Sequence, residues 1–171
     1  MSFPAELVRD FVNTYDVEAE TDELSSPAEL ALWLRERGLA GPRDRATEED
    51  LHTALALREG LRAALKRETA DLPALPLRVS VTEGERPVLV PAEGGVQGGL
   101  AGIAVAAVEA SWDRLKVCSE ATCQWAFIDS SRNRSRSWCS MRVCGNRTKT
   151  RAYRARKQGS RRLQGSNTDT V

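Results

Sequence analysis

Four cysteines constrain this chain more than any other feature of its sequence. Cys118 and Cys123, then Cys139 and Cys144, form two C-x4-C pairs separated by fifteen residues, and the chain has no other cysteine. Two such pairs can close a four-coordinate site, and four thiolates suit a structural Zn²⁺ with no open position for a catalytic water. Two disulfides or an iron–sulfur cluster are the alternatives.

The N-terminus argues against the disulfide alternative. The segment MSFPAELVRDFVNTYDVEAE lacks the basic and apolar regions of a secretory signal. We therefore expect a cytoplasmic protein, in which thiols stay reduced and metal binding is favoured over disulfides. The longest apolar run, residues 100–108, is too short to span a membrane. One structural zinc is the expected cofactor.

The spacer between the cysteine pairs, QWAFIDSSRNRSRSW at residues 124–138, is expected to form a small β-hairpin. Trp125 and Phe127 would lie on its first arm, and DSSRNRS would supply the turn. Together with Trp112 and Trp138, these two residues would form the small core of the module. So small a core needs the bound metal in order to fold.

Charge is divided between two parts of the chain. Residues 1–110 hold 11 basic and 20 acidic side chains, a net charge of −9, whereas residues 111–171 hold 14 basic and 4 acidic ones, a net charge of +10. Between residues 132 and 162 there are 12 basic residues and no acidic one. A solvated helix face normally mixes both signs, so this run indicates a surface that binds a polyanion.

A helix that begins near Cys144 would place Arg147, Arg151, Arg154 and Gln158 on one face. A loop of alternating arginine and serine at residues 131–137 could grip phosphates, and Asn146, Arg147 or Arg151 could read base edges. Tyr153 could pack on the metal module or contact a base. The candidate DNA contacts are Arg132, Arg134, Arg136, Arg142, Asn146, Arg147, Lys149, Arg151, Arg154, Arg156 and Lys157.

The acidic part is expected to be mainly helical with a short β-hairpin. Ser26 and Thr47 are N-cap residues of two helices, the second with a core stripe of Leu51, Leu55, Leu61 and Leu65. The segments LPLRVSV and PVLVPA flank TEGER at residues 82–86 as two strands. EGGVQGG, residues 93–99, is expected to be a flexible break before a helix over residues 100–115.

These elements predict an α+β fold with a mainly helical N-terminal domain over residues 1–110, which senses a signal or oligomerises. A zinc module with a β-hairpin and a basic helix would follow over residues 111–162, and a disordered tail over residues 163–171.

No catalytic constellation is visible. His52 is the only histidine, and the chain shows neither a Ser/His/Asp set nor a phosphate-binding loop. We therefore do not expect an enzyme. Asn13 and Thr14 in DFVNT are expected to form a capped turn that holds the N-terminus on the core, or alternatively to face a pocket for a small-molecule effector.

Residues 118–158 resemble the CGNR-type zinc finger, named for the tetrapeptide that is here Cys144–Gly145–Asn146–Arg147. The N-terminal part, with DFVNTYD at residues 10–16 and PAELALWL at residues 27–34, is similar to the ABATE domain. That domain usually precedes the finger in bacterial proteins described as putative stress-induced transcription regulators. The resemblance implies zinc binding by the four cysteines and DNA binding.

The resulting hypothesis is a zinc-dependent, DNA-binding transcription regulator of a bacterial cytoplasm. A homodimer and an unknown small-molecule effector are the further partners considered, and no membrane is expected. An RNA-binding module, or an adaptor that docks its basic surface on an acidic partner, is the alternative.

Overall fold

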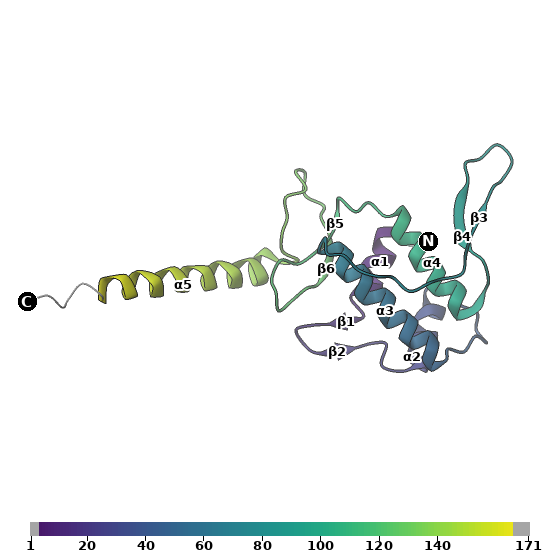
Figure 1. Ribbon diagram of the computed structural model, residues 1–171, viewed down its shortest axis with the longest axis horizontal. Helices are drawn as coiled ribbons and strands as arrows, with labels where there is room; N and C mark the ends of the chain where they lie inside the picture. Colours follow the sequence, from purple (N-terminus) through teal and green to yellow (C-terminus); the bar gives the residue numbers. More distant parts are fainter. Residues whose placement is uncertain (1–3, 166–171) are drawn as a thin grey trace, which may run out of the picture.

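A computed structural model describes residues 4–165 of the chain, with side chains up to residue 158. The α+β class expected from the sequence is confirmed, with helices that predominate over short antiparallel strand pairs (Figure 1). In chain order the elements are α1 (Pro4–Val12), β1 (Tyr15–Asp16), β2 (Thr21–Asp22), α2 (Pro27–Glu36), α3 (Glu48–Leu65), β3 (Leu77–Ser80), β4 (Val88–Pro91), α4 (Gly95–Glu109), β5 (Leu115–Val117), β6 (Ala126–Ile128), a π-helical turn (Met141–Gly145) and α5 (Asn146–Gly165).

Helices α2 and α3 begin where their caps predict. The Ser26 hydroxyl accepts a hydrogen bond from the Glu29 backbone N–H. At α3, Thr47 and Asp50 form a reciprocal capping box, in which each side chain accepts from the other residue's backbone N–H. These bonds satisfy N–H groups that have no partner inside the helix, so local sequence alone defines both helix starts.

The buried face of α3 differs from the predicted leucine stripe. Of the four predicted leucines only Leu61 is buried, and the other three are partly buried. Arg58 and Arg62 lie on the buried face and are only 4% and 3% exposed. Apolar periodicity could not identify this face, because two of its central residues are charged and are paired only in the tertiary structure.

Arg58 and Arg62 bind the segment that follows α1. The Arg58 guanidinium contacts both carboxylate oxygens of Asp22, at 2.6 and 2.8 Å, and donates to the Thr14 hydroxyl. Arg62 donates to the backbone carbonyls of Val12 and Tyr15. These bonds satisfy the two buried charges and hold the β1–β2 pair against α3.

The glycine-rich segment is not the flexible break that the sequence suggested. Helix α4 starts at Gly95, inside that segment, and ends at Glu109 rather than near Leu115. A Cβ on Gly98 would lie 2.2 Å from the Glu93 carbonyl oxygen, and one on Gly99 would lie 2.8 Å from the Leu39 carbonyl oxygen. These glycines therefore permit close packing of the helix on neighbouring backbone.

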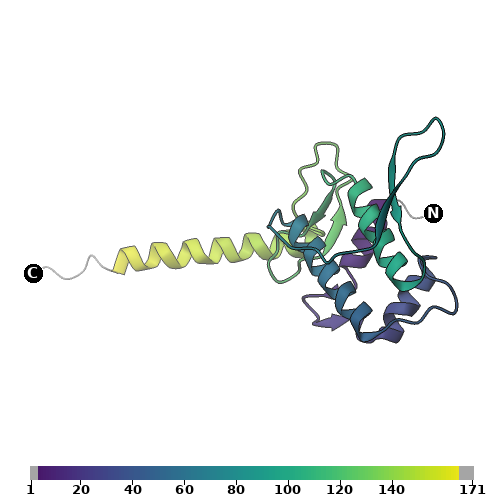
Figure 2. The ribbon, with the colours of Figure 1, turned by 45° about the vertical axis from the view of Figure 1, so that its right-hand side comes forward.

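The predicted β3–β4 hairpin is present, with Leu77 opposite Pro91 and Ser80 opposite Val88. It projects from the helical body beside α4 (Figures 1 and 2). The position of TEGER as the connection between the two strands is confirmed.

The β5–β6 hairpin packs directly on the helical body. Leu115 and Ala126 are buried in the same core as α1, α3 and α4, and Val117 and Ile128 pack against its edge. The zinc module is therefore attached to the rest of the protein through shared apolar burial, which stabilises both.

Helix α5 leaves this body and extends away from it (Figures 1 and 2). It continues to Gly165, whereas the sequence suggested disorder from residue 163; residues 166–171 of that expected tail lie outside the described part. Within residues 4–165, no helix combines the length and apolar character that a membrane crossing requires.

Candidate metal centre and nucleic-acid interface

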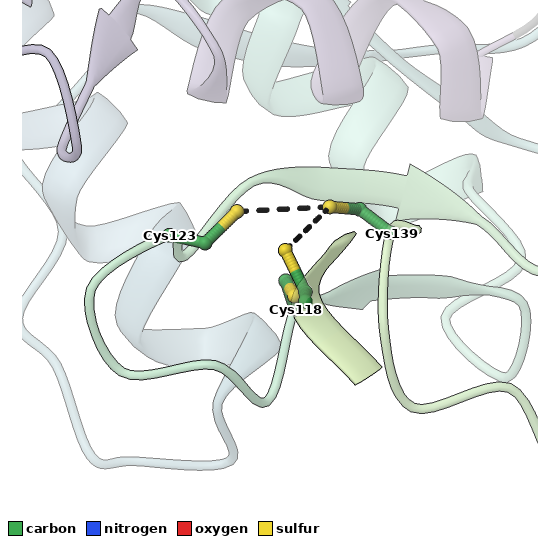
Figure 3. Close-up of side chains that lie close together, drawn as sticks. Cys118, Cys123 and Cys139 are labelled. Carbon is green, nitrogen blue, oxygen red and sulfur yellow. Dashed lines mark hydrogen bonds between the residues drawn. The ribbon is translucent and has the colours of Figure 1, made fainter. Parts of the chain in front are cut away.

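The four cysteines converge on one point. Their sulfur atoms all lie within 4.8 Å of one another, and Figure 3 shows the close approach of Cys123 and Cys139. The Sγ–Sγ distances are 3.6 Å from Cys123 to Cys139 and 3.7 Å from Cys139 to Cys144. A regular tetrahedron with Zn–S bonds of about 2.3 Å has edges of about 3.8 Å, so the observed spacing fits a four-thiolate zinc site.

Two turns present these thiols. Cys118 follows β5, and its backbone N–H donates to the Trp125 carbonyl across the hairpin. Cys123 closes the turn before β6. In the second pair, Cys139 precedes the π-helical turn and Cys144 lies within it; the Ser140 hydroxyl caps this turn by accepting from the Val143 N–H.

The predicted hairpin is therefore misplaced in sequence. Its arms are β5, which precedes Cys118, and β6, so the turn between them carries the first cysteine pair. The arginine-rich loop comes after β6 and does not form a second arm. Of the predicted small core, Phe127 is buried and Trp138 packs on the thiols, but Trp112 belongs to the body, since its indole donates to the Ala107 carbonyl of α4.

Without a cation, burial keeps part of this thiol cluster protonated. Burial raises the pKa of the Cys123 thiol to about 11, and it also raises the pKa of Cys139. Thiolates crowded at this distance repel one another and have lost hydration. A bound Zn²⁺ favours their deprotonation, and with four sulfur ligands its coordination is closed.

Glu120 fixes the direction of α5, and sequence reasoning missed it. This carboxylate lies in the first cysteine turn, is only 1% exposed, and accepts from the Thr148 hydroxyl at 2.8 Å and from Arg151 at 3.0 Å. Thr148 is the largest cause that lowers the pKa of Glu120 to about 2, so the carboxylate stays ionised. The signal in the sequence was an acidic residue between two metal ligands.

A second acidic residue contacts α5 from the helical body. Arg147 forms an ion pair with Glu18 at 2.8 Å and donates to the Thr122 hydroxyl. Both partners of the ion pair are partly exposed, so water and salt weaken it. The first turns of α5 are thus tied to both the metal module and the body.

The loop after β6 is organised by Asp129, which is fully buried. The Lys116 ammonium lies 2.6 Å from a carboxylate oxygen of Asp129 and is the main cause that holds the pKa of Asp129 well below its usual range. The backbone N–H groups of Ser131 and Arg136 also donate to this carboxylate. Arg136 donates to the carbonyls of Trp138 and Cys139 and lies over the Phe127 ring. Arg134 forms an ion pair with Asp113. Two of the three predicted loop arginines therefore also have structural partners.

The other predicted DNA contacts are largely solvent-exposed. Residues 149–158 are all exposed, including Tyr153 at 60%, and Arg132 and Arg142 are exposed on the metal module. The Asn146 amide donates to the Arg142 carbonyl at the start of α5. The remaining predicted residues lie along the projecting helix: Lys149, Arg154, Arg156 and Lys157.

Asn13 and Thr14 form hydrogen bonds with protein groups. The Asn13 side chain donates to the Ala126 carbonyl at 2.9 Å and accepts from the Ala126 N–H at 2.8 Å, so it binds β6 as a neighbouring strand would. Thr14 donates to the Phe11 carbonyl and accepts from Arg58. These contacts agree with a turn that holds α1 in place, extended by a link to the metal module.

His52 is exposed on α3. In the part of the chain that the structure describes, the four cysteines form the one group of three or more metal-binding side chains that could share an ion. The site therefore combines a structural metal with a long basic helix.

Comparison with known families agrees with this arrangement. Residues 5–113 match the ABATE family, described as "Putative stress-induced transcription regulator", and residues 114–157 match the CGNR zinc finger. No curated protein matches the chain. With four clustered cysteines in the finger, the site is that of one structural zinc. The chain thus belongs to the ABATE family and carries a C-terminal CGNR zinc finger.

Proposed function

We propose that this protein is a cytoplasmic DNA-binding transcription regulator in which a structural zinc holds α5 for insertion into the major groove. The observation that carries the proposal is α5 itself: twenty residues with no acidic side chain, projecting from the body (Figure 2). Ten consecutive residues, 149–158, are exposed. Beyond its first turn, the described part of this helix is exposed and gains little stability from packing on its own protein, so this surface suits an external partner.

The dimensions of α5 suit duplex DNA. At 1.5 Å per residue the helix is about 30 Å long, and the B-DNA major groove, about 12 Å wide, accepts an α-helix. The contacts of Glu120 and Glu18 near its start set the direction of the helix relative to the body. The basic residues farther along would then meet the two phosphate backbones that border the groove.

The basic residues would divide into two roles. Lys149, Arg154, Arg156 and Lys157 on the helix, with Arg132 and Arg142 beside it, would neutralise phosphates and give salt-dependent affinity. Arg147 and Arg151 could read bases only after exchanging their carboxylate partners. For Arg147 this exchange costs little, because water and salt screen its partly exposed ion pair with Glu18.

The N-terminal domain would supply regulation. One helix reads few base pairs, so a homodimer on two half-sites would provide the specificity that a regulator needs. An effector bound to the N-terminal domain would act through the shared core around Leu115 and Ala126. We assign no catalytic role to the metal, since four thiolates close its coordination.

The test is the salt dependence of DNA binding by the zinc-loaded full chain, measured by fluorescence anisotropy with mixed-sequence duplexes. The double variant Arg154→Gln/Lys157→Gln should bind roughly tenfold more weakly than the wild type. Its salt slope, the slope of the logarithm of the binding constant against the logarithm of the salt concentration, should be about two units smaller in magnitude. The matched control, Arg78→Gln/Arg86→Gln, removes two exposed charges from the β3–β4 hairpin region and should bind like the wild type.

Hairpin RNA and single-stranded DNA serve as competitors in the same assay. Stronger binding to either would replace duplex DNA by that nucleic acid as the ligand, because the exposed Tyr153 could stack on an unpaired base. Absence of salt-sensitive binding to every nucleic acid would refute the proposal and favour a protein partner.

A further inference from the structure

A basic pocket lies at the junction of the two halves of the chain, outside the helix assigned to DNA. It has a volume of about 610 Å³ and opens between the C-terminal end of α3 and the loop after β6. Three serines and an apolar wall of Leu65 and Val117 also line it. None of the described residues that line the pocket is acidic, and five are basic: Lys66, Arg67, Lys116, Arg134 and Arg136.

The charges of this pocket are only partly neutralised. Lys116 is paired with Asp129, and Arg134 with Asp113. Arg136 donates to backbone carbonyls, which leave its positive charge uncompensated. Lys66 and Arg67 are exposed, and none of the ion pairs within residues 4–158 involves them. Cations gathered in a concave surface focus positive potential and attract an anion.

Backbone turns position two of the pocket's arginines. Arg67 has φ of 64° and Arg134 has φ of 51°, so both adopt the left-handed conformation that glycine tolerates best. Both arginines are among the residues that line this pocket. Both positions are local turns: at the end of α3 the Glu68 N–H donates to the Ala63 carbonyl and the Arg67 N–H to the Ala64 carbonyl, and the Arg134 N–H donates to the Ser131 carbonyl. These turns place the two arginines beside the pocket.

We propose that this pocket binds a phosphate group. Guanidinium groups and an ammonium donate charge-assisted hydrogen bonds to phosphate oxygens, and serine hydroxyls can complete the shell. The volume falls within the range of small-molecule sites and would hold a nucleotide-sized molecule. Because α3 supplies Lys66 and Arg67 while the metal module supplies Arg134 and Arg136, an occupied site would tie the N-terminal domain to the finger.

The phosphate could belong to a free phosphorylated molecule or to the backbone of bound DNA. The site does not rest on the function proposed above, since its anion chemistry is the same in both cases. The two sources differ in whether DNA competes for the pocket.

The first experiment titrates the zinc-loaded full chain with inorganic pyrophosphate at low salt by calorimetry. The double variant Lys66→Gln/Arg67→Gln should bind pyrophosphate at least tenfold more weakly than the wild type. The matched control Arg78→Gln/Arg86→Gln lowers the net charge equally, away from the pocket, and should change the affinity less than twofold. Failure of the wild type to bind pyrophosphate, or equal losses in variant and control, would overturn the proposal.

A single variant separates binding from folding. Arg67→Gly removes the guanidinium group and leaves glycine, the residue best suited to a positive φ, at this position. Its melting temperature should equal or exceed that of the wild type, while its affinity for pyrophosphate falls severalfold. An Arg67→Gly protein that is stable and binds pyrophosphate normally would exclude a role for this side chain and contradict the site.

A DNA competition experiment then identifies the source of the phosphate. If the site takes a free phosphorylated molecule, pyrophosphate should displace a duplex no better than sodium chloride of equal ionic strength. If it holds backbone phosphates, pyrophosphate should displace the duplex specifically, and the Lys66→Gln/Arg67→Gln variant should show a smaller salt slope. Either result agrees with the site, whereas a protein that binds pyrophosphate but no duplex would refute only the DNA-binding function.

Discussion

The link between Asn13 and β6 makes a sharp prediction, because one side chain joins the helical body to the metal module. Asn13→Ala removes two hydrogen bonds, of 2.9 and 2.8 Å, to the carbonyl and N–H of Ala126. Ala126 is fully buried, so both of its backbone groups would lose their partners in a poorly hydrated site. A buried polar group left without a partner costs about 1–3 kcal/mol.

We therefore expect Asn13→Ala to lower the free energy of unfolding by about 2–4 kcal/mol, a large part of the roughly 5–15 kcal/mol of a typical domain. Urea denaturation of the zinc-loaded chain, followed by tryptophan fluorescence, measures this change. Because β5 and β6 flank the turn that carries Cys118 and Cys123, a chromogenic chelator should also remove zinc faster from the variant.

The control is Asn133→Ala, which truncates an exposed asparagine in the loop after β6 and should change the free energy of unfolding by less than about 0.5 kcal/mol. If Asn13→Ala were as mild as this control and released zinc at the wild-type rate, the docking role would be refuted. That outcome would restore the alternative in which Asn13 faces a small-molecule ligand.

Three further predictions concern packing, pH and the metal. Gly98→Ala should destabilise the fold by about 1–3 kcal/mol, because the added Cβ would clash with the Glu93 carbonyl. Gly102→Ala meets only ordinary contacts and should stabilise α4 by about 0.5–1 kcal/mol. Thermal melts of the two variants should therefore shift in opposite directions. Burial would raise the pKa of Asp22, but hydrogen bonds from Arg58 and a backbone N–H outweigh burial and leave the pKa lowered. The ionised carboxylate therefore stabilises the fold above about pH 4, and this stabilisation is lost as the pH falls through the folded pKa. Asp22→Asn should flatten the acid side of a plot of unfolding free energy against pH. Chelation of zinc should lower the melting temperature of the helical body as well as release α5, because β5 and β6 share the body's core. An unchanged melting temperature, followed by the helical circular-dichroism signal, would contradict this coupling.

Local signals in the sequence predicted several elements well. Ser26 and Thr47 define helix starts through bonds to residues three positions away, so no distant contact is needed to recognise them. The β3–β4 hairpin follows from two short β-branched segments around a turn. The prediction of a flexible break in the glycine segment was wrong. Gly98 and Gly99 lie in a helix, against the carbonyl oxygens of Glu93 and Leu39, and only the packed helix brings these groups together.

The candidate site divides in the same way. The spacing of the cysteines, with the expectation of a reducing compartment, predicted the metal, and the charge count predicted a basic surface. Sequence patterns could not reveal Glu120 or the pocket that unites Lys66 with Arg136, as those depend on where distant segments meet.

By itself, the sequence determined the chemistry of this protein: four thiolates for zinc, a helix of one charge sign, and an α+β body of opposite net charge. The tertiary structure alone decided how these parts are joined. Arg58 and Arg62 could be buried only once carboxylate and carbonyl partners from elsewhere in the chain surrounded them, and Asn13 could bind Ala126 only across 113 residues of sequence. Local propensity reports the free energy of nearby residues, whereas pairings between distant ones become favourable only when folding has already brought them together.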